Sequence, residues 1–286
     1  MHEYKTWSTP FVKEEQIPIP CTLCGGIVFK PRYQCSGFSY VECKRCHLVQ
    51  QNPQPESSAV LERYQNENYL RYELKNEQAF LRLGMLGLND AGIVSIEKRN
   101  FQLGKNRFLD VGCATGALLT HLRDRGWQAC GVEPNPAQAE FARSSRALDV
   151  RTSTLEDAGF APSSFDILHA SHVIEHLNKP SFFVQKAFEI LRPGGFFIVV
   201  TPNIAGFQAR VFKEYWRSAI FDHLYLFSRN TLKSLLIKHG FVVEKTVTWG
   251  GLAAGIAPLP LKNIADRAAK LLNIGDVMLF RARKPG

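Results

Sequence analysis

The stretch FLDVGCATGALL, residues 108–119, combines an apolar run with one acidic residue and two glycines. Residues 108–111 predict a buried strand, Gly112 and Gly116 a tight turn, and the residues after them a helix. This arrangement brings backbone N–H groups and a helix N-terminus to a ligand. A carboxylate on a buried strand is costly without a partner, so we expect Asp110 to face a cation or hydrogen-bond donors.

The composition predicts one full-size domain with a small additional module. The chain has 286 residues, of which 45% are hydrophobic and 11% aromatic, enough for a substantial core. The first residues, MHEYKTWSTP, lack the basic-then-apolar pattern of a signal peptide. No apolar run approaches the roughly 20 residues of a membrane span. We therefore expect a cytoplasmic protein.

Four of the seven cysteines form two close pairs, Cys21 with Cys24 and Cys43 with Cys46. The spacing C-x2-C-x18-C-x2-C predicts a zinc ribbon over residues 18–51, because two such turns supply four thiolates for a tetrahedral Zn²⁺ site. Zn²⁺ is therefore an expected bound metal.

The charge of the chain does not favour a nucleic-acid partner. The formal net charge is +9, and one zinc held by four thiolates lowers it to +7. Residues 21–51 contain four Lys or Arg and one Glu, so the predicted ribbon with its zinc site carries only about +1. This charge is weak for binding phosphates.

Patterns along the chain predict four segments: a flexible arm over residues 1–17, the ribbon, a helical connector over 52–100 and an α/β domain over 101–286. Strands and helices alternate in the last segment, which is typical of a doubly wound, Rossmann-like sheet, here of seven strands with an antiparallel edge strand. The expected strands are 107–111, 129–132, around 150, 165–170, 196–201, 241–248 and 276–284, and the expected helices are 117–125, 136–146, 180–191, 231–239 and 264–274.

The glycine turn favours an amino-acid-bearing nucleoside over a dinucleotide. Its G-x-A-x-G spacing differs from G-x-G-x-x-G, and a pyrophosphate would be repelled by Asp110. An α-ammonium group could instead use this carboxylate. Glu133 ends the next predicted strand, 23 residues after Asp110, where an acid can accept both ribose hydroxyls.

These residues resemble the class I S-adenosylmethionine-dependent methyltransferases. The matching motifs are LDVGCATG at 109–116, GVEPN at 131–135 and LRPGG at 191–195, and the resemblance covers residues 101–286. It implies that S-adenosylmethionine is the cofactor, and that the adenine lies near Leu155 and Glu156. Ala114 stands where the family often has glycine.

The predicted ribbon followed by this domain is similar to bacterial zinc-ribbon methyltransferases that act on sugars and other small metabolites. Sugar C-methyltransferases share a segment that resembles FDHLYLFS, residues 221–228. They usually have a further C-terminal domain, which this sequence does not show.

Two clusters could supply catalytic groups beside the methyl donor. In HASHVIEHL, residues 169–177, one helical turn would place His172, Glu175 and His176 on one face. We assign His172 to the cofactor site and the other two to catalysis, although Glu175 and His176 could equally cap and orient the helix.

The second cluster, residues 211–228, is rich in aromatic side chains and suits a lid. We expect His223 to be the general base, assisted by His176, with Asp222 fixing the His223 tautomer.

A metal is the alternative for the first cluster. Quinone-pathway O-methyltransferases of this superfamily carry a similar acid-x-x-Glu-His cluster that binds magnesium, and His172 here replaces the first acid. A histidine suits magnesium poorly.

Residues 249–261, WGGLAAGIAPLPL, carry no charge and precede a helical stretch with Lys and Arg on its polar side. The segment 249–274 could touch a membrane surface or a lipid-like substrate. We favour a cover over a substrate pocket or a dimer contact.

The sequence therefore predicts an S-adenosylmethionine-dependent methyltransferase that acts on oxygen or carbon of a small molecule or glycan precursor. Two alternatives remain: an RNA methyltransferase that uses the ribbon to read RNA, and a non-catalytic zinc-ribbon binding module.

Overall fold

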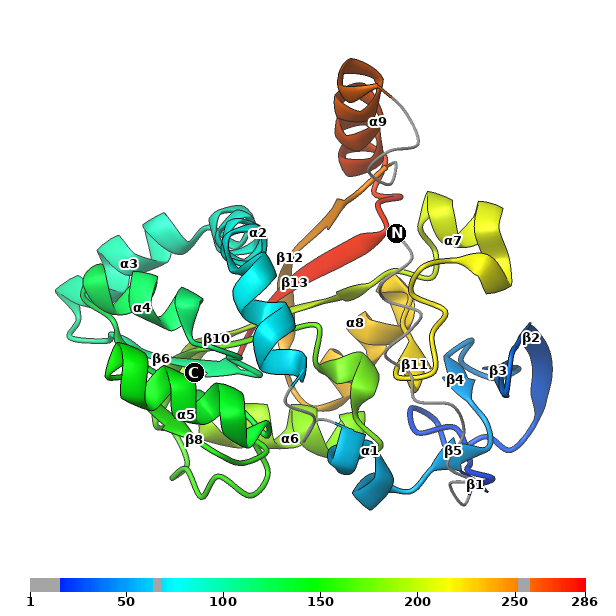
Figure 1. Cartoon of the computed structure of the whole chain (residues 1–286), viewed down its shortest axis with the longest axis horizontal. Coiled ribbons are helices and arrows are strands. Elements are labelled where there is room, and N and C mark those ends of the chain that lie inside the picture. Colours follow the sequence, from blue (N-terminus) through cyan, green and yellow to red (C-terminus); the bar gives the residue numbers. More distant parts are fainter. Residues whose placement is uncertain (1–15, 64–67, 252–257) are drawn as a thin grey trace.

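The computed structural model describes residues 16–63, 68–251 and 258–286. In this part of the chain, a seven-stranded mixed sheet forms the centre of the molecule and a four-stranded antiparallel sheet lies beside it (Figure 1). Helices alternate with the strands of the larger sheet. The predicted doubly wound α/β fold with a small additional module is confirmed.

The strands of the larger sheet follow the order β12-β13-β10-β9-β6-β7-β8. Their bounds are β6 Arg107–Val111, β7 Gln128–Val132, β8 Asp149–Arg151, β9 Phe165–Ser171, β10 Leu191–Pro202, β12 Val242–Trp249 and β13 Val277–Arg283. Five strands, from β8 to β10, pair in parallel, whereas β13 runs antiparallel to both β10 and β12.

The expected antiparallel pairing of the last two strands at the edge of the sheet is confirmed, with β12 as the edge strand and β13 one place inside it. Met278, Leu279 and Phe280 of β13 are almost completely buried. Strand β12 is partly exposed along much of its length, and it forms the edge. Strand β13 is buried because β10 and β12 pair with both of its edges and because its two faces pack in different cores: Met278 and Phe280 in one, Leu279 in the other.

Four of the five expected helices of the α/β domain begin and end within two residues of the expected bounds, whereas the last begins at residue 259 and not at 264. Their bounds are α1 Ser57–Arg63, α2 Asn68–Ala91, α3 Ile93–Gln102, α4 Ala117–Asp124, α5 Pro136–Arg146, α6 Pro180–Ile190, α7 Phe207–Phe212, α8 Arg229–Lys238 and α9 Leu259–Leu271, with short 3₁₀ turns η2 Ile174–His176 and η3 Lys213–Tyr215. Capping explains two starts: the Asn135 side chain accepts from Gln138 N before α5, and Ser228 forms a capping box with Thr231 before α8.

The two faces of the larger sheet pack in separate cores. Phe108 on β6 faces a cluster with residues of α2, α3, α4 and α5, whereas Leu109 faces a cluster with residues of α6 and α8. This division follows from the alternation of side chains along a strand. Cys21 and Leu48 of the ribbon belong to the second cluster, so the ribbon shares the core of the larger domain.

The smaller sheet has the order β11-β4-β3-β2, with bounds β2 Phe29–Cys35, β3 Phe38–Cys43, β4 Val49–Gln51 and β11 Tyr225–Leu226. The first three strands come from the predicted ribbon, but β11 comes from the α/β segment of the sequence. Strand β11 pairs antiparallel with β4. The ribbon is therefore completed by a segment about 175 residues away in the chain.

Of the predicted N-terminal arm, residues 1–15 lie outside the described part. The two residues that follow them form β1 Gln16–Ile17, which pairs antiparallel with β5 Gln54–Pro55. The start and the end of the ribbon region are thereby held together.

Helix α9 projects from the body of the molecule (Figure 1). It exposes Leu261, Ile264 and Leu271, and Leu272 directly after it is exposed as well, while residues 252–257 of the apolar stretch before it lie outside the described part. Among the described helices none is by itself long and apolar enough to cross a membrane. Taken together, the bent pair α2 and α3, at 68° to each other, is long and apolar enough for a membrane span by length and composition alone.

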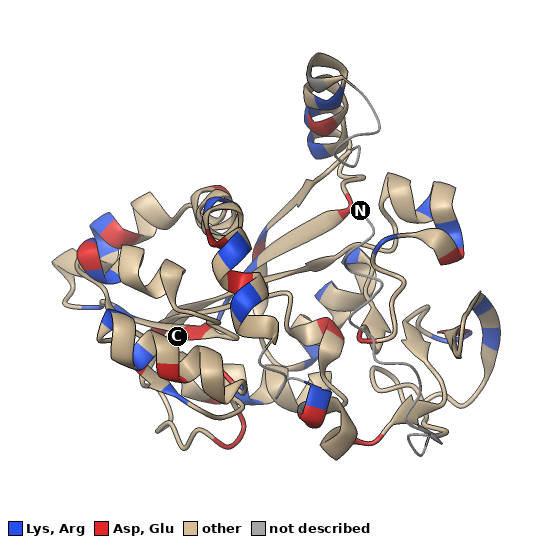
Figure 2. Ribbon diagram, in the orientation of Figure 1, with Lys and Arg blue, Asp and Glu red and all other residues tan. Residues whose placement is uncertain are grey.

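Lys and Arg are distributed over most elements of the molecule and are interspersed with Asp and Glu (Figure 2).

Candidate active site and cysteine cluster

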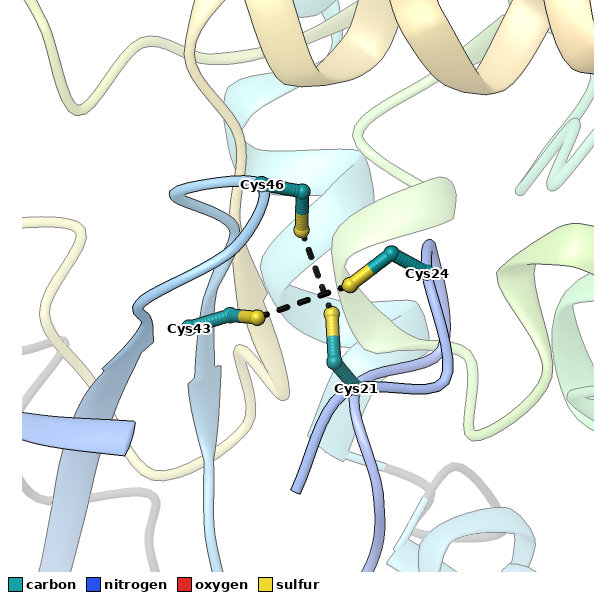
Figure 3. A group of neighbouring side chains, drawn as sticks. All are labelled: Cys21, Cys24, Cys43 and Cys46. Atoms are coloured by element: carbon teal, nitrogen blue, oxygen red, sulfur yellow. Dashed lines mark hydrogen bonds between the residues drawn. The ribbon is translucent and has the colours of Figure 1, made fainter. Parts of the chain in front are cut away.

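The four cysteines of the ribbon converge from two turns of the chain (Figure 3). The Sγ atoms of Cys21 and Cys46 lie 3.3 Å apart, and those of Cys24 and Cys43 lie 3.5 Å apart. All four Sγ atoms are within 4.8 Å of one another, and no disulfide joins the described cysteines. Each close pair takes one sulfur from each turn, which is the arrangement that two ribbon turns give around one ion.

The backbone packs closely against these sulfurs and leaves little space for a side chain at Gly26. A Cβ on Gly26 would lie 3.3 Å from the Sγ atoms of both Cys24 and Cys43. Gly25 has a φ of +72° and donates its N–H to Cys21 O at 2.7 Å, which closes the first turn. Four soft donors at these separations fit a tetrahedral zinc, and Cys21, Cys24, Cys43 and Cys46 are the residues that would hold it.

The turn after β6 needs its glycines. Gly112 has a φ of +71°, and a Cβ there would lie 2.8 Å from Val173 Cγ2. Gly116, with a φ of +78°, would place a Cβ 2.4 Å from Leu148 Cδ1. Ala114 also has a positive φ, +48°, which accounts physically for the glycine that the family often has there.

Glu133, at the end of β7, connects two loops of the expected cofactor site. Its carboxylate accepts Ala114 N and Asn135 N, both at 2.9 Å. Burial raises the pKa of Glu133 to about 7, an effect that these two backbone N–H groups reduce and the nearby Asp110 increases. Donors from a ribose diol would favour the ionised form further.

Asp110 finds its partner within the protein. His169 Nδ1 lies 2.7 Å from Asp110 Oδ1, and both side chains are buried. The two residues stand side by side in the pairing of β6 with β9. A single histidine thus explains how an acid is accommodated on a buried strand, and the second carboxylate oxygen faces no hydrogen-bond donor that the described contacts include.

Helix α2 contacts the glycine turn. Glu77 accepts a hydrogen bond from Thr115 Oγ1 at 3.0 Å and pairs with Arg146 of α5. One helical turn earlier, burial raises the pKa of Glu73 to about 7, with the charges of Glu133 and Glu77 adding to the effect. The expected connector therefore forms a wall of the expected cofactor site.

The 3₁₀ turn after β9 fixes Glu175 completely inside the protein. Its carboxylate accepts from His172 Nδ1 at 3.1 Å and from Thr201 Oγ1 at 2.9 Å. Although burial opposes ionisation, the hydrogen bond from His172 and the nearby histidines lower the pKa of Glu175 to about 2. His172 has a φ of +56° and a half-exposed side chain. Glu175 therefore orients His172.

His176 and His223 lie against each other, as the sequence analysis expected. Their ring centroids are 4.6 Å apart and the rings are nearly perpendicular. His176 Nδ1 donates to Asp222 O at 2.9 Å and His223 Nδ1 donates to Ser218 O at 2.8 Å. When neutral, the His223 ring therefore keeps Nε2 as a proton acceptor. Burial, with the charge of His176, lowers the pKa of His223 to about 3, so this ring is neutral near pH 7.

Asp222 has a different position from the one expected. Its carboxylate pairs with Arg63 at 3.3 Å, and the Ser218 carbonyl, not Asp222, fixes the His223 tautomer. The ligand atoms that come together within 4.8 Å belong to Glu175, His176 and His223, whereas the metal alternative had His172 in place of His223. Two imidazoles and one carboxylate suit magnesium poorly.

Residues 69–246 match a family model described as a methyltransferase domain. The chain belongs to this methyltransferase family. The match begins within the segment expected to be a connector, which agrees with the contact of α2 with the glycine turn. The sheet order and the three motifs identify this methyltransferase as a class I, S-adenosylmethionine-dependent type.

Curated relatives of this methyltransferase include two ubiquinone biosynthesis O-methyltransferases. The protein of Azorhizobium caulinodans is 34% identical over 102 residues, covering 34% of this chain and 40% of the relative. That of Bradyrhizobium diazoefficiens is 34% identical over 132 residues, covering 43% of this chain and 51% of the relative. The chain thus spans about half or less of the length of the curated relatives that it matches.

A solved structure with the same fold is the S-adenosylmethionine-dependent methyltransferase of Thermotoga maritima. It is 23% identical, has a TM-score of 0.52, and covers 76% of this chain and 98% of its own. This likeness shows the fold of this methyltransferase.

Leu155 and Glu156, the two residues expected near the adenine, have different surroundings from each other. Leu155 is buried in the main core, and burial raises the pKa of the Glu156 carboxyl. Their assignment to cofactor binding stays a prediction.

His169 and the two glutamates of α2, Glu73 and Glu77, were not among the residues predicted for the site. A signal for His169 was present, since it is a polar residue in a buried strand, as Asp110 is. No local pattern connects Glu73 or Glu77 with the glycine turn, because only the fold brings α2 to it.

Proposed function

We propose that this protein transfers the methyl group of S-adenosylmethionine to a hydroxyl oxygen of a small molecule. The names of the matched relatives support oxygen as the acceptor atom. Transfer to carbon of a sugar-like precursor is the alternative, because His223 lies in the FDHLYLFS segment that resembles sugar C-methyltransferases.

The observation that carries the proposal is the pair of histidines held by backbone carbonyls. S-adenosylmethionine, when bound, supplies an electrophilic methyl group on a sulfonium. His223 is buried and neutral, and its Nε2 can take the hydroxyl proton as the acceptor oxygen becomes nucleophilic. His176 assists by packing against this ring.

For cofactor binding, the proposal depends on Glu133, which would bind the ribose, and on the backbone of residues 112–116, which would lie close to the bound cofactor. Glu133 would exchange backbone donors for ribose hydroxyls, or share its oxygens among both, since each carboxylate oxygen accepts more than one hydrogen bond. Asp110 keeps His169 in place, and its second oxygen would accept from the α-ammonium group of the cofactor.

The charge of the ribbon supports a small acceptor over RNA. Within the ribbon, Glu42 pairs with Lys30 at 3.0 Å and with His47 at 2.9 Å, so this lysine already has an acidic partner inside the ribbon. Loss of RNA binding with rising salt, with a steep slope, would instead indicate phosphate contacts.

The test combines cofactor titration with isotope transfer. Calorimetric titration of S-adenosylmethionine should show binding, and labelled methyl should pass to a catechol-type hydroxyl acceptor or a sugar nucleotide but not to RNA. With an accepted substrate, His223→Asn should reduce turnover roughly 100- to 10,000-fold while cofactor affinity and melting temperature stay close to wild type.

His239→Asn is the matched control, because His239 binds Ser181 at 2.7 Å, outside the histidine pair. If His223→Asn stays folded and turns over within about threefold of wild type, His223 is not the base. Methyl transfer to RNA alone would contradict the proposed acceptor class.

A further inference from the structure

The five residues that carry His223, Ile220–Leu224, form no helix or strand, yet His223 and Leu224 are buried. Buried backbone carbonyls need hydrogen-bond donors. Asp222 O accepts from His176, and the other four carbonyls of the segment all accept from residues of the ribbon region.

Two buried side chains provide most of these donors. Gln51 Nε2 lies 2.8 Å from Phe221 O and 2.9 Å from His223 O. Tyr40 Oη lies 2.8 Å from Ile220 O and 2.7 Å from His223 O, so its single proton serves one of the two at a time. The His223 carbonyl is thus held by both side chains.

Tyr40 and Gln51 are direct cross-strand partners in the pairing of β3 with β4. Strand β3 ends at Cys43, the turn that connects it to β4 contains Cys46, and Cys43 N donates to Leu48 O at 2.9 Å across this turn. A metal bound to the two cysteines would fix the same register that places Tyr40 opposite Gln51. Strand β4 continues the contact, because Gln51 N donates to Leu224 O at 2.8 Å.

We propose that Tyr40 and Gln51 are positioning residues for His223, and that the metal-bound ribbon is thereby part of the acceptor site. The inference rests on the proposed function insofar as His223 is the base. The ribbon then acts on the reaction from within the protein, through two side chains that hold the peptide of His223, and it needs no contact with the acceptor.

The experiment compares Gln51→Met and Tyr40→Phe with wild type and with Gln50→Met. Gln50 is the matched control: it is an equally buried glutamine on the same strand, but its Nε2 donates to Pro20 O at 3.3 Å within the ribbon. The readout is the pair of ¹⁵N imidazole shifts of His223, which report the tautomer without any acceptor. Metal content and calorimetric binding of S-adenosylmethionine are measured on each variant.

In wild type, His223 should show one tautomer, with the proton on Nδ1. Gln51→Met and Tyr40→Phe should lose this single signature while they keep the metal and bind S-adenosylmethionine within about twofold of wild type. Gln50→Met should keep it. Tyr40→Phe removes only a hydroxyl, so it decides the matter if Gln51→Met fails to fold.

An unchanged His223 signature in Tyr40→Phe and Gln51→Met would overturn the proposal, and so would an equal loss in Gln50→Met. Removal of the metal by a chelator should also abolish the signature, and its persistence would contradict the role of the metal. Failure of wild type to bind S-adenosylmethionine would count against the proposed function alone, because the tautomer readout does not use the cofactor.

Discussion

Burial raises the pKa of Glu133, so the protonation state of this acid, and with it the binding of the cofactor ribose, should change near neutral pH. With a pKa of about 7 in the free protein, it is half protonated near neutral pH. A ribose diol donates to the carboxylate but less well to the neutral acid. We therefore expect the dissociation constant of S-adenosylmethionine to rise roughly tenfold as the pH falls from 8 to 6, because most of the carboxylate is then lost. Calorimetric titration across this range measures it.

Glu133→Gln is the control for this pH dependence. The amide cannot ionise, so any remaining change with pH belongs to the ligand or to other groups. The variant should bind at least tenfold more weakly at pH 8, since it loses hydrogen bonds to a charged acceptor worth roughly 1.5 to 3 kcal/mol. Equal pH profiles for variant and wild type would show that Glu133 does not hold the ribose.

Ala114 has a backbone conformation that glycine adopts at lower cost. Its φ of +48° lies in the left-handed region, where an L side chain costs about 1 to 2 kcal/mol. Ala114→Gly regains this energy and loses roughly 0.4 to 1 kcal/mol through the greater freedom of the unfolded chain. We expect the free energy of unfolding to rise by up to about 1 kcal/mol, measured by urea denaturation.

Ala139→Gly in α5 is the comparison for this substitution. This alanine has an ordinary helical backbone, so the change should destabilise the protein by about 1 kcal/mol. Two substitutions of the same chemistry would thus have opposite signs. Destabilisation by Ala114→Gly as well would mean that the turn does not store this strain.

Site residues that belong to a local sequence motif could be predicted, whereas the hydrogen-bond partners that hold them could not. The acid on the buried strand and the histidine pair followed from spacing and position, and the structure brings His176 and His223 together. The tautomer of His223 depends on Ser218 O, a backbone atom that no sequence pattern marks. The partner of Asp110 could have been suspected only by aligning two predicted strands in register.

At the scale of elements, long periodic segments were predictable and short paired ones were not. Strand β6 and helix α5 have the predicted bounds. The two residues of β11 carry no strand signal of their own, because their conformation is set by pairing with β4. The last two strands were predicted as a pair at the edge, but not which of the two would lie inside it.

The pairing of β11 with β4 predicts that metal removal reaches the α/β domain. When a chelator withdraws the metal, amide hydrogens of residues 220–228 should exchange faster, because the strand that holds them loses its register. Amides of β6 and of the glycine turn should keep their protection, since their partners lie in the larger sheet. Hydrogen exchange with mass spectrometry measures both regions in one sample.

Cys35→Ser controls for the removal of a thiol outside the cluster, because Cys35 is not among the four converging sulfurs. It should leave exchange in both regions as in wild type. Equal acceleration over residues 107–116 would indicate general unfolding and contradict the local effect.

At the scale of the whole molecule, the ribbon and the α/β domain share one core. Cys21, Leu48 and Phe183 belong to the same buried cluster, and Lys238 Nζ of α8 donates to Leu23 O at 3.0 Å. We therefore expect the metal-bound protein to unfold in a single calorimetric transition, with equal calorimetric and van't Hoff enthalpies.

A separate low-temperature transition would contradict this prediction and would support the four-segment division of the sequence, in which the ribbon is an independent unit. Lys238→Met is a useful comparison, because it removes one contact between the two parts without touching a cysteine. A single but slightly lower transition is expected for it.

Tyr33 Oη, on β2, donates to Ala209 O at 3.2 Å across 176 positions of the chain. Together with the pairing of β11 and the hydrogen bonds to the peptide of His223, this contact joins the ribbon and residues 209–228 into one structural unit. Two separate stretches of the sequence encode this unit. Exchange of acceptor preference between related enzymes would then require both stretches to be transplanted together. A graft of residues 209–228 alone would bring carbonyl groups whose donors remain behind in the parent protein.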